Sequence, residues 1–341
     1  MTSDTMDEAL EFLADRGPIY RGYLVNHGPM AAEVLLQLDR ADAVLPYLEW
    51  YGTRLEDRAP LRGRVDAINW REMLGKHEEF EAWLRFFDAE LGQQPWRKAL
   101  DTWTARLAPG LWSDLLHGVI RTGHAARSLA ALETPLRLRE LAEALALWAT
   151  WYEELPEAPG GGGALSPREA FARLPLLPPE QRGLREPMDA RDAVPGLEAV
   201  AGLLDVSEPM AALSEFTEAY AGLYVANAGL PGNSAILLIH AVTGPSALRL
   251  IAPFVSLETQ QRLLRYAWQA AAKVNASWNF GGAPVDVEPA ELDRDDVIER
   301  AIAGRDEHAM KLVEACLREY AVNPRPVYLA AARDVVARLS V

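Results

Sequence analysis

Apolar residues recur at spacings of three and four along most of this 341-residue chain. The clearest run is Leu111, Leu115, Leu116, Val119 and Ile120. Such spacing places apolar side chains on one face of an α-helix, whereas the alternation typical of β-strands is scarce here. The pattern predicts an all-α fold. Helices are expected near residues 29–39, 42–57, 76–91, 95–107, 111–131, 135–153, 208–228, 233–251, 256–276, 293–304, 306–321 and 325–340.

A glycine- and proline-rich stretch interrupts this pattern near the middle of the chain. Residues 160–163 are four consecutive glycines, which hold neither a helix nor a strand. We therefore expect residues 155–195 to form a flexible crossover between two helical halves. The prediction is a single, bundle-like helical domain over residues 1–341, and two separate domains are the alternative.

Composition excludes several classes of function. The formal net charge of −15 argues against nucleic-acid and anionic-membrane partners, because both require a basic face. The single cysteine, Cys316, excludes an intrachain disulfide and paired-thiolate metal motifs. The N-terminus is acidic, and no uncharged apolar run reaches the roughly 20 residues that span a bilayer. A cytoplasmic protein is expected.

Histidine placement is the strongest indication of chemistry. Four of the six histidines, His27, His117, His240 and His308, each lie in a separate apolar, helix-like segment. Imidazoles carried inward by several helices are a usual way to build a metal site in a helical bundle. For each histidine alone, a helix cap or a core position bonded to a backbone carbonyl is the competing interpretation.

The segment around His117 carries further polar residues on the same face. His124 follows seven residues later, with Arg121 between them, so the three form a polar stripe within an apolar helix. Such a stripe destabilises the fold unless each group finds a partner. Gly118 and Gly123 suit a helix poorly and are expected to make room for another backbone or for a ligand.

The other histidine motifs leave alternatives open. Asn26 and His27 precede a helix, so they either cap it or direct His27 toward a ligand. Thr243, three residues after His240, either orients that imidazole or bonds its own helix. His77 lies among charged residues and is expected to be exposed.

Lys311 lies three residues after His308, which places both on one helical face. An ammonium group repels a metal cation, but a lysine carboxylated by carbon dioxide becomes an anionic oxygen ligand. The alternative is a surface lysine paired with Glu307 or Glu314. Asp306 and Glu307 are further candidate carboxylate ligands.

Common cofactor motifs are absent from the sequence. There is no Gly-x-Gly-x-x-Gly after a strand, no Gly-x-x-x-x-Gly-Lys-Ser/Thr and no Gly-x-Ser-x-Gly. We therefore expect neither a classical nicotinamide fold nor a flavin.

Four short motifs in order resemble the questin oxidase-like family. They are Asn26-His27, His117-Gly-Val-Ile-Arg121, His240-Ala-Val-Thr243 and Asp306-Glu307-His308-Ala-Met-Lys311, and the resemblance runs from about residue 20 to 335. The family includes bacterial members and fungal enzymes that open or oxidise anthraquinone-type rings in Baeyer–Villiger-like reactions. Its fold is largely helical, and a ring-cleaving branch holds non-haem iron with histidines and a carboxylated lysine.

The resemblance implies that His27, His117, His240, His308 and Lys311 are metal ligands. It implies an iron(II) oxygenase that uses dioxygen on a small aromatic or polyketide-like substrate, with NADPH as a possible external electron donor. Arg121 and His124 are then expected to orient the substrate or stabilise a developing oxyanion. A zinc-dependent hydrolase with the same ligands and a noncatalytic helical binding protein are the alternatives.

Overall fold

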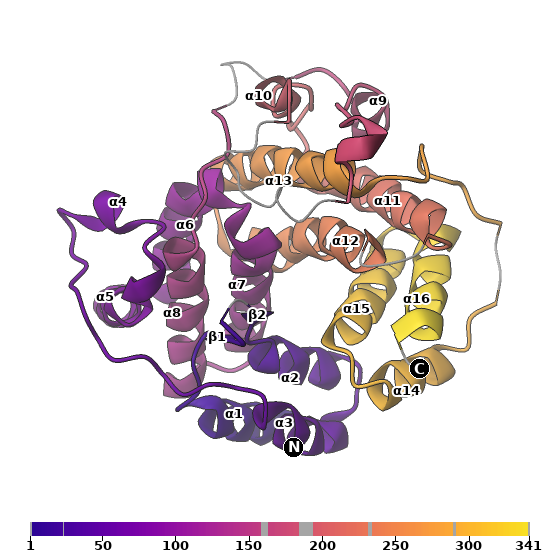
Figure 1. Ribbon diagram of the computed structural model, residues 1–341. Helices are drawn as coiled ribbons and strands as arrows, with labels where there is room; N and C mark the ends of the chain where they lie inside the picture. Colours follow the sequence, from indigo (N-terminus) through magenta and orange to yellow (C-terminus); the bar gives the residue numbers. More distant parts are fainter. Residues whose placement is uncertain are drawn as a thin grey trace. The chain divides into compact units, whose positions relative to one another are not determined.

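A computed structural model describes residues 2–22, 24–157, 163–183, 194–230, 234–288 and 291–339. These residues form sixteen α-helices and one two-stranded antiparallel sheet, so the predicted all-α fold is confirmed (Figure 1). The chain divides into two compact units. Unit 1 comprises Met1–Glu153 with Leu250–Ser256, and unit 2 comprises Glu154–Arg249 with Leu257–Val341. The single-domain organisation stays a prediction.

Unit 1 carries the N-terminal helices and the small sheet. Its elements are α1 (Thr2–Leu13), β1 (Ile19–Tyr20), β2 (Leu24–Val25), α2 (Gly28–Gln37), α3 (Val44–Gly52), α4 (Trp70–Met73), α5 (Phe80–Gln93), α6 (Trp96–Leu107), α7 (Ser113–Ala131) and α8 (Pro135–Thr150). Short 3₁₀ turns lie at Ala41–Ala43, His77–Glu79, Ala108–Gly110 and Ala252–Phe254.

Helix α1 is a helix that the sequence patterns did not predict. Its apolar residues Met6, Ala9, Leu10 and Leu13 are all buried and share one face. That face packs against α2, α3 and α8. The acidic residues between these positions obscure the pattern, but they suit the solvent-facing side of a helix.

Helices α7 and α8 pack closely because a glycine lies where they meet. A Cβ on Gly118 would approach the side chain of Trp148 to 2.7 Å, closer than van der Waals contact permits. The indole of Trp148 also donates to the carbonyl of Gly110 at 3.0 Å. Of the two expectations for Gly118, close approach of another helix is therefore the one observed.

Unit 2 carries the C-terminal helices. Its elements are α9 (Pro167–Phe171), the 3₁₀ turn Pro179–Gln181, α10 (Leu197–Val200), α11 (Pro209–Asn227), α12 (Ser234–Ile251, whose last two residues belong to unit 1), α13 (Leu257–Trp278), α14 (Arg294–Ala303), α15 (Glu307–Val322) and α16 (Pro326–Leu339). Helices α15 and α16 lie side by side, and α16 also packs on α11 (Figure 1). An aromatic cluster of Phe216, Tyr220 and Trp268 joins α11 to α13.

The predicted crossover is only partly described. Residues 158–162 and 184–193 of the 155–195 stretch lie outside the described residues, and the parts described include α9, with α10 following the stretch. One helical stretch, Ile236–Phe254, is long and apolar enough to cross a membrane. Because 78% of it is buried inside the protein, as in a core helix, this is weak evidence for a span.

Candidate metal centre

His27 precedes α2, and contacts on both sides fix its position. Its main-chain N–H donates to the Tyr51 hydroxyl at 2.8 Å, and its imidazole Nδ1 donates to the Val25 carbonyl at 2.7 Å. The side chain of Asn26 accepts from the N–H of Gly28 at 2.9 Å, whereas His27 makes no capping bond. Asn26 therefore caps the helix, and the ring of His27 is directed elsewhere.

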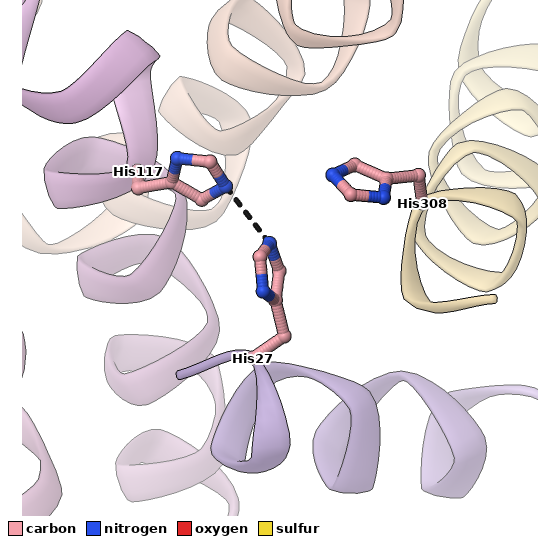
Figure 2. A group of neighbouring side chains, drawn as sticks. All are labelled: His27, His117 and His308. Atoms are coloured by element: carbon pink, nitrogen blue, oxygen red, sulfur yellow. Dashed lines mark hydrogen bonds between the residues drawn. The ribbon is translucent and has the colours of Figure 1, made fainter. Parts of the chain in front are cut away.

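The ring of His117, on α7, meets the ring of His27. Their Nε2 atoms lie 2.9 Å apart and the ring planes are nearly perpendicular, at 85° (Figure 2). The Nδ1 atom of His117 donates to the carbonyl of Asp114 at 2.6 Å. Since a carbonyl only accepts, both histidines carry their proton on Nδ1 and a lone pair on Nε2.

Two lone pairs that face each other at this distance repel. The contact between His27 and His117 therefore requires a positive charge, either a second ring proton on one histidine or a metal ion bound by both. Unit 1 thus contains a buried pair of facing imidazoles whose contact requires a shared positive charge.

His117 contacts His27, which directly precedes α2, whereas Arg121 contacts α8, so the residues of the predicted stripe meet different neighbours. His124 contacts α2 itself. Its Nδ1 lies 2.7 Å from a carboxylate oxygen of Glu33, and Arg127 donates to both oxygens of Glu33 at 2.6 and 2.5 Å. Burial alone would raise the pKa of Glu33, but Arg127 and His124 more than offset it, and the pKa is lowered. Glu33 therefore stays ionised and orients the His124 ring.

Arg121 is buried and held by acidic residues of α8. Its Nε and Nη2 donate to the two oxygens of Glu140, each at 2.7 Å, and Nη2 also reaches Glu143 at 2.9 Å. Burial raises the pKa of Glu140, although Arg121 opposes this. Among the described residues, the buried Nη1 of Arg121 has no hydrogen-bond partner. Arg121 also borders a cavity of about 160 Å³, with Asn26 and Pro29.

Unit 2 contains a second histidine pair. The rings of His240, on α12, and His308, on α15, have centroids 5.2 Å apart. The Nδ1 of His240 donates to the carbonyl of Ile236 at 3.0 Å, and that of His308 lies 3.5 Å from a carboxylate oxygen of Asp306. Thr243 bonds the carbonyl of its own helix at 3.1 Å, so it does not orient His240 through a hydrogen bond. For His240, the carbonyl contact places the ring proton on Nδ1.

Lys311 is buried in α15, with 1% of its surface exposed. Its Nζ has no hydrogen-bond partner among the described residues, so the alternative of a surface lysine paired with Glu307 or Glu314 is wrong. Glu314 instead bonds Arg318 at 3.0 Å. Burial lowers the pKa of Lys311 to about 8, with the charge of Glu307 in partial opposition. A large fraction of this amine is therefore neutral at mildly alkaline pH.

Asp306 acts as the N-cap of α15. One of its carboxylate oxygens accepts the main-chain N–H groups of His308 and Ala309, at 2.9 and 3.1 Å. Burial would raise the pKa of Asp306, but its hydrogen bonds to His308 lower it overall. This carboxylate is committed to the helix terminus and to the imidazole.

The acidic partners of the polar stripe are the residues that the sequence analysis missed. Glu33, Glu140 and Glu143 anchor His124 and Arg121. Glu33 is the one charged residue of α2, whereas Glu140 and Glu143 follow Arg137 and Arg139 in α8. A charged residue on a buried helical face indicates a charged partner, and that reasoning would have found them. The sixth histidine, His77, is exposed as predicted and stacks on Trp151 at 5.5 Å.

A cavity of about 510 Å³ lies in unit 2, between α9, α11, residues 283–287 and the start of α16. Its walls include Phe171, Val285 and Val327, and its rim carries Arg168 and Glu218. None of the predicted site residues lines it, so we do not assign it to the histidine chemistry.

An all-helical fold with two histidine pairs whose Nδ1 atoms face oxygen acceptors defines a class of candidate metalloproteins. The chain belongs to the questin oxidase-like family, because that family's model matches residues 50–316. Membership implies an oxidoreductase of the oxygenase type. The matched region includes His117, His240, His308 and Lys311, whereas His27 precedes it. No curated protein matches the chain.

Proposed function

We propose that this protein is a non-haem iron(II) oxygenase that acts on an electron-rich aromatic or polyketide-type ring, by ring cleavage or Baeyer–Villiger-like oxygen insertion. One observation carries the proposal. Four imidazoles, two in each unit, each have Nδ1 against an oxygen acceptor. Metal-binding histidines almost always engage their second nitrogen in this way, which fixes the tautomer and raises the basicity of the ligand nitrogen.

The spacing of the pair in unit 1 also fits a metal ion. Two nitrogen ligands about 2.1 Å from one ion and at right angles to each other lie about 3.0 Å apart. The Nε2 atoms of His27 and His117 lie 2.9 Å apart. Imidazole donors suit iron as well as zinc, copper and nickel, so oxygenase family membership supports the choice of iron. The proposed ligands are His27, His117, His240, His308 and Lys311.

Lys311 would act as a carbamate. The neutral Nζ attacks the carbon of carbon dioxide, a new N–C bond forms, and one N–H proton leaves to solvent. The product is an anion with two oxygen donors. The buried, unpartnered Nζ and its lowered pKa support this chemistry, because the reaction needs an amine without its extra proton.

Held by the proposed ligands, iron(II) would supply the redox chemistry that activates dioxygen toward a substrate ring. The protein's own residues would prepare the substrate. His124, held through Nδ1 by Glu33, would orient the substrate. Arg121 keeps only Nη1 for a developing oxyanion, since its other donor atoms bond Glu140 and Glu143.

The proposal includes dioxygen and a small aromatic or polyketide-like molecule as partners, with NADPH as a possible external electron donor. It includes a cytoplasmic location and no nucleic-acid or membrane partner. The buried, unoxidised Cys316 is compatible with a reducing compartment.

A zinc-dependent hydrolase is the second candidate function, and the donor set itself supports it. Imidazole nitrogens and a carbamate oxygen suit zinc, and bound zinc lowers the pKa of water to about 7. In a noncatalytic binding protein, the third alternative, the histidines would serve packing alone.

Isotope labelling tests the proposal. The purified protein is loaded anaerobically with iron(II), mixed with hydroxylated anthraquinones as probe substrates and exposed to ¹⁸O-labelled dioxygen. The proposal predicts products heavier by one or two labelled oxygen atoms, and no such products from His117→Ala. Products that take up the label only when ¹⁸O is supplied as water, and not as dioxygen, would support the hydrolase. Iron-loaded protein that consumes no dioxygen with any probe would contradict the oxygenase.

A further inference from the structure

The chain winds left-handed immediately before His117. Asp114, Leu115 and Leu116 have φ/ψ angles of 43/53°, 55/52° and 68/4°. All three lie in the left-handed region, and none is glycine. Single aspartates visit this region, but leucines rarely do, and consecutive residues there are rarer still.

Such a backbone persists only where its surroundings enforce it. Trp148 of α8 holds the chain on both sides of the turn. The Ser113 hydroxyl, just before it, donates to the Trp148 carbonyl at 3.2 Å. Gly118, just after His117, lies so close to Trp148 that a Cβ there would meet the indole at 2.7 Å. The contacts of Ser113 and Gly118 with Trp148 therefore hold the chain in place before and after the turn.

The turn is followed directly by His117, whose imidazole contacts the ring of His27. The carbonyl of Asp114, its first residue, accepts the Nδ1–H of His117 at 2.6 Å. The backbone conformation of residues 114–116 therefore sets both the tautomer of His117 and the direction of its Nε2.

We infer that the left-handed turn Asp114–Leu116 is a positioning device for His117, which uses backbone strain to hold Nε2 against the Nε2 of His27. The inference deepens the proposed function, on which its metal-binding consequence rests. The orientation of the ring itself is a property of the protein without metal.

Two substitutions at Asp114 distinguish the effect of the backbone conformation from the effect of the carboxylate. Asp114→Gly removes the carboxylate and the Cβ, and because glycine adopts left- and right-handed conformations about equally, it removes the strain at this position and makes the turn flexible. Asp114→Ala removes the same carboxylate but keeps a Cβ at this position. Both retain the buried leucines, and circular dichroism verifies that both variants fold.

The readout is ¹⁵N NMR of the His117 imidazole in metal-free protein, together with cobalt(II) affinity. The inference predicts that Asp114→Gly increases hydrogen exchange at Nδ1 of His117 and weakens cobalt binding about ten-fold or more. Asp114→Ala should leave both near the wild-type values. Unchanged exchange in Asp114→Gly, or equal changes in both variants, would overturn the inference. If the wild type binds no cobalt, the proposed metal function fails, and the NMR measurement still decides the positioning role.

Discussion

The Nε2 atoms of His27 and His117 face each other at 2.9 Å while both Nδ1 atoms donate to main-chain carbonyls. This arrangement places two lone pairs within one contact, so it needs either an additional proton or a metal ion. A core histidine kept for packing would use one nitrogen on a carbonyl and direct the other toward a donor. An extra proton would make the contact a hydrogen bond of this structural kind, and the proposed function assigns it to a metal ion instead.

Removal of either ring should abolish metal-dependent stabilisation. We expect the wild type to gain thermal stability when iron(II) is added anaerobically, because a ligand that binds only the folded state stabilises it. His27→Ala and His117→Ala should melt at the same temperature with and without iron. Thermal denaturation measures this, with His77→Ala, at an exposed site, as the control that keeps the wild-type response. An equal iron response in His117→Ala would contradict the assignment.

Lys311→Met should stabilise the metal-free protein near neutral pH. The pKa of Lys311 is about 8 in the folded protein against 10.5 in the unfolded chain, so the unfolded chain binds the proton more tightly. The buried amine of Lys311 therefore destabilises the folded protein by its full amount below pH 8, and this effect disappears as the pH rises toward 10.5. We expect a gain of about 1–3 kcal/mol in the free energy of unfolding at pH 7. Urea denaturation at pH 7 and 10 measures it.

The control for this measurement is Lys98→Met, at an exposed position of α6, which should change stability little at either pH. A loss of stability in Lys311→Met at pH 7 would mean that the buried amine has a stabilising partner.

Asp114→Asn should stabilise the protein above pH 7 and have little effect at pH 4. Burial, aided by the charge of Glu153, raises the pKa of Asp114 from 3.8 to about 7. The folded protein thus holds a proton that the unfolded chain releases, and stability falls as the pH rises from about 4 to 7. At pH 8 the variant should gain about 1–3 kcal/mol. Unfolding curves at the two pH values test this, and a gain of equal size at pH 4 would refute the titration.

Glu140→Ala should be strongly destabilising because it leaves the buried Arg121 without its main partner. Loss of one member of a buried ion pair typically costs about 3–5 kcal/mol. The double variant Arg121→Met/Glu140→Leu should recover much of that loss, since it removes the unpaired charge as well. Denaturant unfolding provides the values. Asp57→Ala, which breaks the exposed pair with Arg16, is the control and should change little.

The helices could be predicted from the sequence because each buries an apolar stripe with the helical period. Helix α7, for example, was expected at 111–131 and is observed at Ser113–Ala131. Helix α1 was missed because acidic residues alternate with its buried positions. The β1–β2 pair was missed because two-residue strands show no periodicity.

The candidate site was predicted only in part. Sequence spacing indicated that His117 and His124 share a face; His124 contacts Glu33 of α2, and His117 contacts His27 just before that helix. It did not reveal Glu33 as the partner of His124, because that contact joins residues 91 positions apart. Nor did it reveal the carbonyls of Val25 and Asp114, since backbone acceptors leave no mark in the amino-acid sequence.

Elemental analysis of the purified protein tests the central claim most directly. The protein is expressed without a chelator, incubated anaerobically with iron(II) and desalted beside His117→Ala, His240→Ala, Lys311→Met and the His77→Ala control. The account predicts nearly one iron per chain in the wild type and in His77→Ala, and a loss of iron in the other three variants. A wild type that retains no metal, or iron that persists in all the variants, would contradict it.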